Sequence, residues 1–184
     1  MVLRSTYESV SKNGFEFDSV DYGHVKGWFP DHIAKSIEDA EQYGPFDYVV
    51  VSPKTIPEVQ KTQDLVAPLV KKGTTIVLVQ NGIGGEEPVM EAFPDSFVVG
   101  GISMIGSANY GGVIHHKIPD ELYIGTYDKR PEAQAAMEKF RDAYDASKSK
   151  CEIIPNLKYR RWCKLIYNSS LNTTAALTGI DVMR

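Results

Sequence analysis

Cysteine, net positive charge and long apolar runs are all scarce in this sequence. Only Cys151 and Cys163 occur among 184 residues, so we expect no disulfide framework and take a reducing cytoplasm as the compartment. The formal net charge of −4 argues against a general nucleic-acid binder, which needs a basic surface. No run reaches the ~18 apolar residues of a membrane span, and the first residues lack the apolar stretch of a secretory signal. We therefore expect neither nucleic acid nor a membrane among its partners.

The full glycine fingerprint of dinucleotide-binding folds is missing as well. Gly82-Ile83-Gly84-Gly85 lacks the G-x-G-x-x-G spacing, and Glu86 and Glu87 stand where a pyrophosphate would meet the helix N-terminus. We interpret these glycines as a turn that aims Asn81, with the two acids suited to the helix dipole. No two histidines are spaced as metal ligands, so no metal site is expected.

The chain does contain apolar, β-branched runs that alternate with helical periodicity. Short links join them, which is typical of right-handed β-α-β units on a parallel sheet. The first run is continuous in the way expected of a strand that is covered on both faces. The sequence predicts strands at 46–51, 74–79 and 97–99, with helices at 56–70 and 86–93 between them.

The regions on either side of these units have a different hydrophobic pattern. Alternating apolar and polar residues predict an N-terminal hairpin from 15–20 and 23–29. After Gly100-Gly101 the strands become short, which we interpret as an antiparallel extension. The remaining elements expected are strands around 113–115 and 122–124, a helix at 131–146 with proline in its first turn, and an edge strand at 151–154.

Three polar residues are expected at the carboxyl ends of parallel strands, where open α/β sheets bind ligands. They are Arg4 after a short N-terminal strand, Lys54 after the 46–51 run, and Asn81 after the 74–79 run. Two cations and an amide in one crevice suit a phosphorylated ligand such as a nucleotide. Each could be a solvated loop residue instead, but their shared topological position favours a binding site.

A polar ridge on the last predicted helix is the most informative feature. Lys164, Asn168 and Asn172 are spaced four apart, so they stack along one side of a helix. Amide and hydroxyl side chains are poor in helix interiors because they compete for backbone hydrogen bonds. The ridge therefore predicts a device that grips and protonates a small polar ligand; the alternative is a solvent-facing lysine on a weak helix. Another side is predicted to be packed, and it carries Trp162, Leu165, Ile166, Ser169 and Ala176.

Together these motifs resemble the ketopantoate reductase family over nearly all 184 residues. Residues 80–84 look like that family's Asn-Gly-[Leu/Met]-Gly turn, and 51–54 resemble its strand-ending lysine. Residues 162–172 match its W-x-K-L-x-x-N-x-x-x-N helix position by position, and 175–178 continue as its Ala-Leu-Thr segment. The resemblance implies NADPH-dependent reduction of 2-dehydropantoate (ketopantoate) to pantoate, a step towards pantothenate and coenzyme A.

The resemblance also implies roles for the individual residues. Lys164 would be the general acid, because an ammonium close to the carbonyl oxygen can stabilise and then protonate it. Asn168 and Asn172 would hold the polar groups of the substrate. The cofactor residues implied are Arg4 at the 2′-phosphate of NADPH, with Lys54 and Asn81 lining the cleft for nicotinamide and substrate.

The fold class implied is α/β. We expect a Rossmann-type parallel sheet lacking its first βα unit, followed by the start of an all-helical C-terminal domain. The expected division is an incomplete NADP-binding Rossmann-like domain at 1–155 and the first helix of a truncated substrate and dimerisation domain at 156–184. The full-length form would be a homodimer, built on surfaces that this chain mostly lacks.

The sequence departs from the family pattern at both ends. The family has a strand and G-x-G-x-x-G turn about 25 residues before the position of Arg4, and a helical domain after the position where this chain stops. The chain is therefore expected to bind NADPH poorly and to turn over ketopantoate negligibly. Two alternatives remain: a non-catalytic truncated paralogue or fragment, and a reductase of another 2-keto acid.

Overall fold

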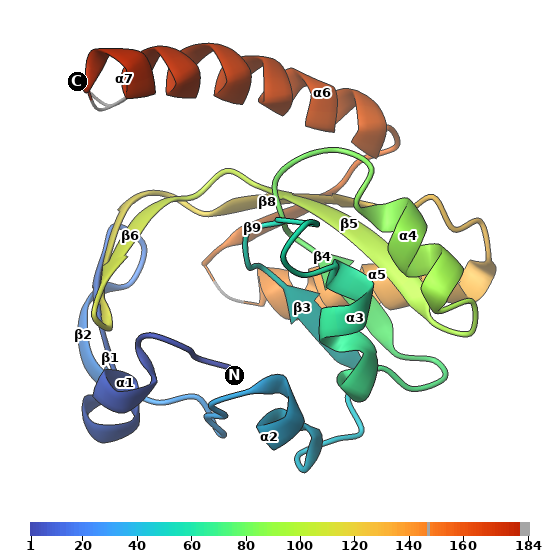
Figure 1. Cartoon of the computed structure of the whole chain (residues 1–184), viewed down its shortest axis with the longest axis horizontal. Coiled ribbons are helices and arrows are strands. Elements are labelled where there is room, and N and C mark those ends of the chain that lie inside the picture. The colour runs from blue at the N-terminus through green and yellow to red at the C-terminus, as the bar shows by residue number, and fades with distance from the viewer. Residues whose placement is uncertain (147, 181–184) are drawn as a thin grey trace.

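The computed structural model describes residues 1–146 and 148–180, which form two sheets flanked by helices (Figure 1). One sheet has the order β3-β4-β5-β8-β9 and the other β2-β1-β7-β6. The strands are β1 (Phe15–Ser19), β2 (Gly23–Trp28), β3 (Tyr48–Val51), β4 (Thr75–Leu78), β5 (Phe97–Ser103), β6 (Gly106–Tyr110), β7 (Val113–Ile118), β8 (Glu121–Gly125) and β9 (Lys150–Ile153). The helices are α1 (Tyr7–Asn13), α2 (Ile37–Glu41), α3 (Thr62–Val66), α4 (Glu86–Ala92), α5 (Pro131–Asp145), α6 (Leu157–Tyr167) and α7 (Thr173–Thr178).

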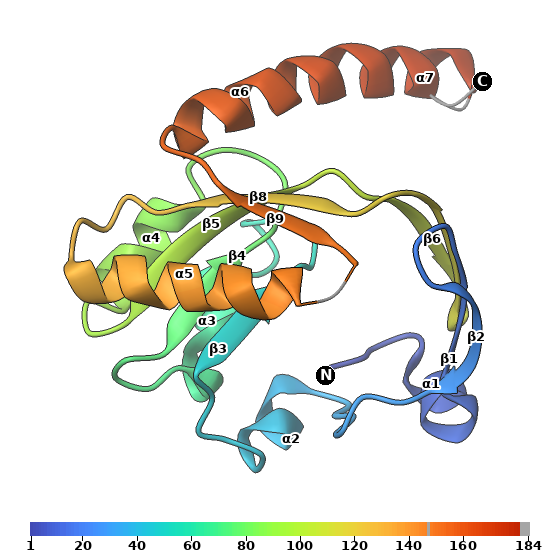
Figure 2. The ribbon, with the colours of Figure 1, turned by 180° about the vertical axis from the view of Figure 1, so that it is seen from behind.

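The five-stranded sheet confirms the predicted β-α-β units. Strands β3, β4 and β5 pair in parallel, with α3 and α4 on one face and α5 on the other (Figures 1 and 2). Successive residues of a strand point to opposite faces. Accordingly, Ile76 and Leu78 of β4 pack in the core beneath α3 and α4, while Val77 packs with Val99 against α5. The sheet is therefore the middle of three layers and holds the carboxyl ends of its strands in place.

Strand β3 was predicted to be covered on both faces, and this is wrong for one of its residues. Val50 is 54% exposed, although Val49 and Val51 are buried. Helix α5 lies over the other strands of this sheet and reaches only Tyr48 of β3, whose hydroxyl donates to the Ala136 carbonyl at 3.0 Å. Because β3 is the edge strand, Val50 falls beyond the cover of α5.

The predicted antiparallel extension divides between the two sheets. Strand β8 pairs antiparallel with β5 as expected, but the strand predicted at 113–115 belongs to the other sheet. There β7 pairs in parallel with β1, which forms the predicted hairpin with β2. Gly111 and Gly112 both adopt positive φ, and their turn folds β7 back along β6 instead of along β5.

The helix predicted at 56–70 is shorter in the structure. Residues Ile56 and Gln60 close a turn with an isolated bridge, and α3 begins only at Thr62. Pro68 has no N–H to donate to a carbonyl one α-turn back, so the chain tightens into a 3₁₀ turn at Ala67–Leu69.

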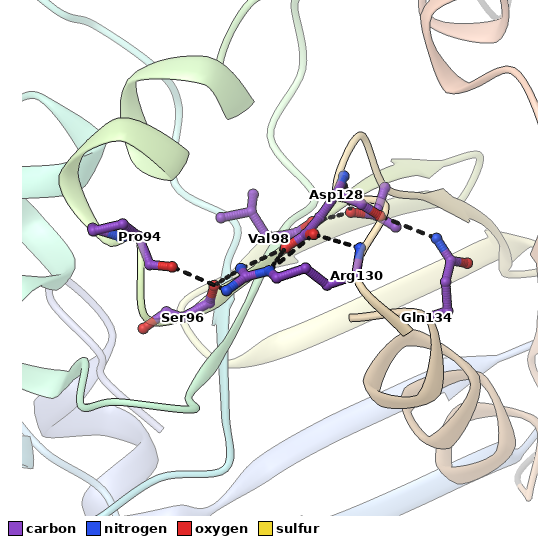
Figure 3. A network of polar contacts seen from close by, with 7 residues as sticks. Pro94, Ser96, Val98, Asp128, Arg130 and Gln134 are labelled. Atoms are coloured by element: carbon purple, nitrogen blue, oxygen red, sulfur yellow. Dashed lines mark hydrogen bonds and ion pairs between the residues drawn. The ribbon is translucent and has the colours of Figure 1, made fainter. Parts of the chain in front are cut away.

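A polar network fastens the start of α5 to the beginning of β5 (Figure 3). The Arg130 guanidinium contacts the Asp128 carboxylate through Nε, at 2.9 Å from Oδ2, and through Nη2. The same guanidinium donates to the carbonyls of Pro94 at 3.0 Å and Ser96 at 2.6 Å. The network therefore satisfies backbone carbonyls of the loop between α4 and β5.

Helices α6 and α7 and the π-helical turn between them (Asn168–Asn172) form one rod. It begins where α6 contacts β5 and β8 of the five-stranded sheet and extends towards the side of the molecule where β6 lies (Figures 1 and 2). The side predicted to be packed is mostly open: Trp162 is 47% exposed and Ile166 is 65% exposed, whereas Leu165 is half-buried and lines the small hollow described below. Helix α6 docks through Leu157 and Arg161 instead, both of which are buried. The division at 155/156 stays a prediction, and its last residues, 181–184, lie outside those described. Among residues 1–146 and 148–180, no helix combines the length and apolar character that crossing a membrane requires.

Candidate active site

The loops after β3 and β4 lie side by side at the carboxyl edge of the sheet. Lys54 and Asn81 are both exposed on these loops. The Gln80 side chain joins them, since its Nε2 donates to the Pro53 carbonyl at 2.9 Å. The structure thus places the two predicted strand-end residues on loops that are hydrogen-bonded to one another.

Arg161 of α6 holds the loop that carries Asn81. Its Nη1 donates to the carbonyls of Gln80 at 3.0 Å and Gly82 at 3.1 Å, and its Nη2 donates to the Leu78 carbonyl at 3.3 Å. These acceptors are the end of β4 and the turn after it. One side chain therefore binds three backbone carbonyls around the end of β4.

The same guanidinium forms a buried ion pair with Glu86, the first residue of α4. Nη2 approaches Oε1 to 2.6 Å, and the two side chains are only 6% and 2% exposed. The contact is a close ion pair without the alignment of a hydrogen bond. The sequence prediction that Glu86 simply complements the helix dipole is incomplete, because the carboxylate is also the counter-charge of a residue 75 positions later.

Room for this pair comes from a glycine. A Cβ on Gly100 of β5 would lie 2.4 Å from Glu86 Oε1, 2.4 Å from Leu157 Cδ2 and 3.3 Å from Arg161 Nη2. Real Cβ atoms do not approach their neighbours so closely. The absence of a side chain at position 100 therefore allows α6 and α4 to meet over β5.

Lys164 follows Arg161 by three residues, on the same side of α6. It is half-buried, and its Nζ donates to the Ser103 carbonyl at the end of β5. Burial lowers the pKa of Lys164 below that of an ordinary lysine, and the neighbouring Arg161 charge lowers it further. The structure thus gives this residue a suitable environment for a proton donor.

Two adjoining hollows are lined by these residues. A small one of about 10 Å³, enough for one water, lies between Asn81, Ile102, Lys164 and Asn168. A wider cleft of about 220 Å³ adjoins it and runs along the glycine turn. Its lining residues are Thr55, Leu78, Gln80, Asn81, Gly82, Ile83, Gly85, Glu86 and Arg161.

Asn168 and Asn172 do not follow an ideal ridge. The turn from Asn168 to Asn172 is π-helical, so the spacing of four no longer stacks side chains as in an α-helix. Asn168 lines the small hollow, whereas Asn172 is exposed and reaches Asn168 Oδ1 only at 3.5 Å. Nearby hydroxyls bond back to the helix, as Thr174 Oγ1 does to the Ser170 carbonyl at 2.8 Å.

Arg4 occupies a different environment from the other predicted site residues. It is exposed in the turn before α1, after a single bridge between Val2 and Ala34. That bridge lies outside the five-stranded sheet. Arg4 therefore does not follow a strand of this sheet, although Val2 packs on the core cluster that lies beneath α3 and α4.

The sequence model of the family described as "Ketopantoate reductase PanE/ApbA" matches residues 1–129. This chain belongs to that family. The chain spans 58% and 53% of the length of the two curated relatives described next.

Both relatives align with nearly the whole chain. An uncharacterized protein of Saccharomyces cerevisiae is 36% identical and covers 100% of it. The 2-dehydropantoate 2-reductase of Nostoc sp. is 27% identical over 93% of it. Among solved structures, the 2-dehydropantoate 2-reductase of Geobacter metallireducens covers 97% of this chain and 57% of its own, with 28% identity and a TM-score of 0.82. That of Methylococcus capsulatus covers 97% and 56%, with 27% identity and a TM-score of 0.78.

Sequence reasoning named Lys164, Asn168 and Asn81, which the structure places around one small hollow, but it did not connect Arg161 with Glu86. The signals available were an acid directly after a glycine turn and an arginine one helical turn before the lysine. Neither of these signals shows that Glu86 and Arg161 meet, because their pairing depends on where α6 docks. The pairing of these two charges is therefore determined by the tertiary structure and not by the local sequence.

Proposed function

We propose that this chain carries the cofactor-binding half and the proton donor of an NADPH-dependent reductase that converts 2-dehydropantoate to pantoate. The observation that carries the proposal is the hollow in which Lys164, Asn168 and Asn81 converge at the carboxyl edge of a parallel sheet. Relatives that bear the name 2-dehydropantoate 2-reductase align over this region. A nicotinamide cofactor and a small keto acid are the ligands proposed.

Lys164 would act as the general acid. A bound NADPH would supply the hydride that reduces the keto carbon. As negative charge develops on the substrate oxygen, the Lys164 ammonium stabilises it and then transfers a proton to it, which leaves a neutral amine. Burial and the Arg161 charge both lower the pKa of Lys164, so the folded protein favours this release. The amides of Asn168 and Asn172 would bind the polar groups of the same substrate.

The cleft of about 220 Å³ fits one end of a dinucleotide. Sites that enclose a whole ligand are larger, roughly 300–1,000 Å³. Gly82, a lining residue, adopts φ +106°, a conformation that favours glycine and leaves bare backbone at the cleft wall. We assign the nicotinamide end to Asn81 and Lys54 here, and the 2′-phosphate end to Arg4 on the N-terminal segment.

The other assignments are part of the same proposal. Residues 1–155 would be the NADP-binding domain, and 156–184 would begin a substrate and dimerisation domain. A full-length form would act as a homodimer. The groups in the hollow recognise features that every 2-keto acid shares, so a reductase of another 2-keto acid is the second candidate.

The test measures NADPH binding and NADPH oxidation by the purified chain with a panel of 2-keto acids. We expect weak binding that prefers NADPH to NADH, with the preference lost in Arg4→Ala. Ketopantoate-dependent oxidation should be slow and should disappear in Lys164→Ala, which retains cofactor binding. If Asn81→Ala and Lys54→Ala bind NADPH as tightly as the unchanged chain does, the assigned cleft is contradicted. Oxidation that survives in Lys164→Ala would contradict the assigned proton donor.

A further inference from the structure

Arg161 occupies the junction of three elements, and the proposed chemistry assigns it no role beyond the effect of its charge on Lys164. It belongs to α6, its carbonyl acceptors belong to the end of β4 and the following turn, and its counter-charge belongs to α4. Its Nε, although buried, has no hydrogen-bond partner. A buried arginine is costly unless its charge and its donors are used. Its carbonyl acceptors and Glu86 are all lining residues of the wider cleft.

We propose that Arg161, held by Glu86, is a positioning residue that fixes the turn carrying Asn81 beneath Lys164. The inference rests on the proposed function of Lys164 and Asn81. It adds a residue that acts through Asn81 and Lys164.

The geometry of the turn supports this role. Nη1 of Arg161 binds the carbonyls of Gln80 and Gly82, which lie on either side of Asn81. Clamping both neighbours fixes where the Asn81 side chain begins. A planar guanidinium offers five donors in a fixed fork, whereas a lysine concentrates its three donors on one nitrogen. Lysine at position 161 would therefore keep the charge but could not hold both carbonyls and Glu86 together.

The same placement gives Arg161 an electrostatic effect on Lys164. Arg161 is the charged group that acts on Lys164 from its own helix, and Glu86 of α4 is the counter-charge of Arg161. Tyr127 after β8 lies in the field of the same ion pair. Arg161 disfavours a second positive charge and so lowers the pKa of Lys164. A carboxylate held against Arg161 has the opposite sign, so Coulomb's law gives Glu86 the opposite effect on Lys164. Removing the charge of Arg161 should therefore raise the proton affinity of Lys164, and removing the charge of Glu86 should lower it.

The experiment measures the acylation of Lys164 in the full chain across a pH series, with a water-soluble amine-selective ester and peptide mass spectrometry. Amide hydrogen exchange of residues 80–84 is measured on the same samples. The variants are Glu86→Gln, Arg161→Lys and Arg161→Met. Arg160→Met is the matched control, because Arg160 is the adjacent, exposed arginine, stacked over Tyr123 at 4.6 Å from the ring centroid.

We expect the pH midpoint of Lys164 acylation to fall in Glu86→Gln and to rise in Arg161→Met, each by about half a pH unit or more. Arg161→Lys should keep the midpoint near that of the unchanged chain but accelerate exchange in residues 80–84 by about tenfold. Arg160→Met should alter neither readout.

Two results would overturn the inference. One is a midpoint that stays fixed in Glu86→Gln; the other is unchanged exchange in Arg161→Lys. Both variants are conservative, so they decide the question even if Arg161→Met does not fold. Neither readout needs cofactor or keto acid, and so the inference and the proposed function can fail separately: a chain that reduces no keto acid still reports on Arg161.

Discussion

Arg130 and Asp128 are joined through two nitrogens of the guanidinium, and the carboxylate is buried while the arginine remains partly exposed. The hydrogen bond from Arg130 is the main reason that the pKa of Asp128 lies below its usual value. The same guanidinium also binds the carbonyls of Pro94 and Ser96, so it joins the loop between α4 and β5 to the start of α5.

Asp128→Asn should destabilise the fold by about 1–3 kcal/mol, because the charge-assisted hydrogen bonds of Arg130 lose their ionised acceptor. The folded pKa of Asp128 is depressed, so its contribution is present above the unfolded pKa of about 3.9 and is lost as the pH falls through the lower folded value. Urea unfolding at neutral and at acidic pH measures both effects.

The control is Asp142→Asn. Asp142 also pairs with a neighbouring arginine, Arg141, but its side chain is 68% exposed, and exposed pairs add little stability. An equal loss of stability in the two variants would contradict the role of the Asp128 network.

Gly100→Ala should destabilise the chain by about 1–3 kcal/mol, as overpacked cores do. The added methyl would collide with Glu86 Oε1 and Leu157 Cδ2, so α6 should show faster hydrogen exchange than the sheet. Gly85→Ala is the matched comparison, because nothing lies within 4 Å of a Cβ there. Native exchange rates in α6 of Gly100→Ala would show that the helix docks without this close approach.

Lys164→Met should change stability in a pH-dependent way. The folded pKa of Lys164 is lowered, so below it the buried ammonium carries its full desolvation cost. That cost is relieved as the pH rises from the folded pKa to the unfolded value of about 10.4. The unchanged chain should therefore gain stability relative to Lys164→Met between neutral pH and pH 10. A constant difference in urea midpoints would contradict the lowered pKa.

The two thiols should differ in reactivity. Burial, together with the nearby Asp145 carboxylate, raises the pKa of Cys151 to about 12, and the thiolate is the reactive form. Cys163 is only partly buried, and both thiols are free. A disulfide reagent at neutral pH should label Cys163 in the folded chain and Cys151 only after unfolding, as followed by mass spectrometry. Simultaneous labelling in the native state would refute the burial of Cys151.

The parallel core could be predicted from the sequence because its information is local. Runs such as Thr75–Leu78 are β-branched or apolar at every position, as a strand between two helical layers requires. The exposure of Val50 could not be predicted in this way, since it depends on how far α5 extends across neighbouring strands. The partner of β7 was missed for the same reason: a strand's pattern does not say which sheet it joins.

The residues of the candidate site also differ in whether the local sequence indicates them. Lys164 and Asn168 were recognisable because a polar ridge on a helix costs propensity and so requires an explanation. Arg161 and Glu86 looked like ordinary surface charges, and only the docking of α6 over Gly100 buries them together. Asn172 was predicted from an α-helical spacing that the π-helical turn alters.

That turn makes the length of the segment as important as its composition. A π-helical turn accommodates one more residue than an α-helical turn. Deleting a single residue between Asn168 and Asn172 would restore regular α-helical winding and, because the π-helical turn takes up that extra residue, would leave the residues downstream facing nearly the same direction around the rod. Leu177, now 84% exposed, would keep its side of the rod, as Lys164 would. A one-codon deletion inside the regular part of α6 or α7 would instead rotate everything downstream of it by about 100°.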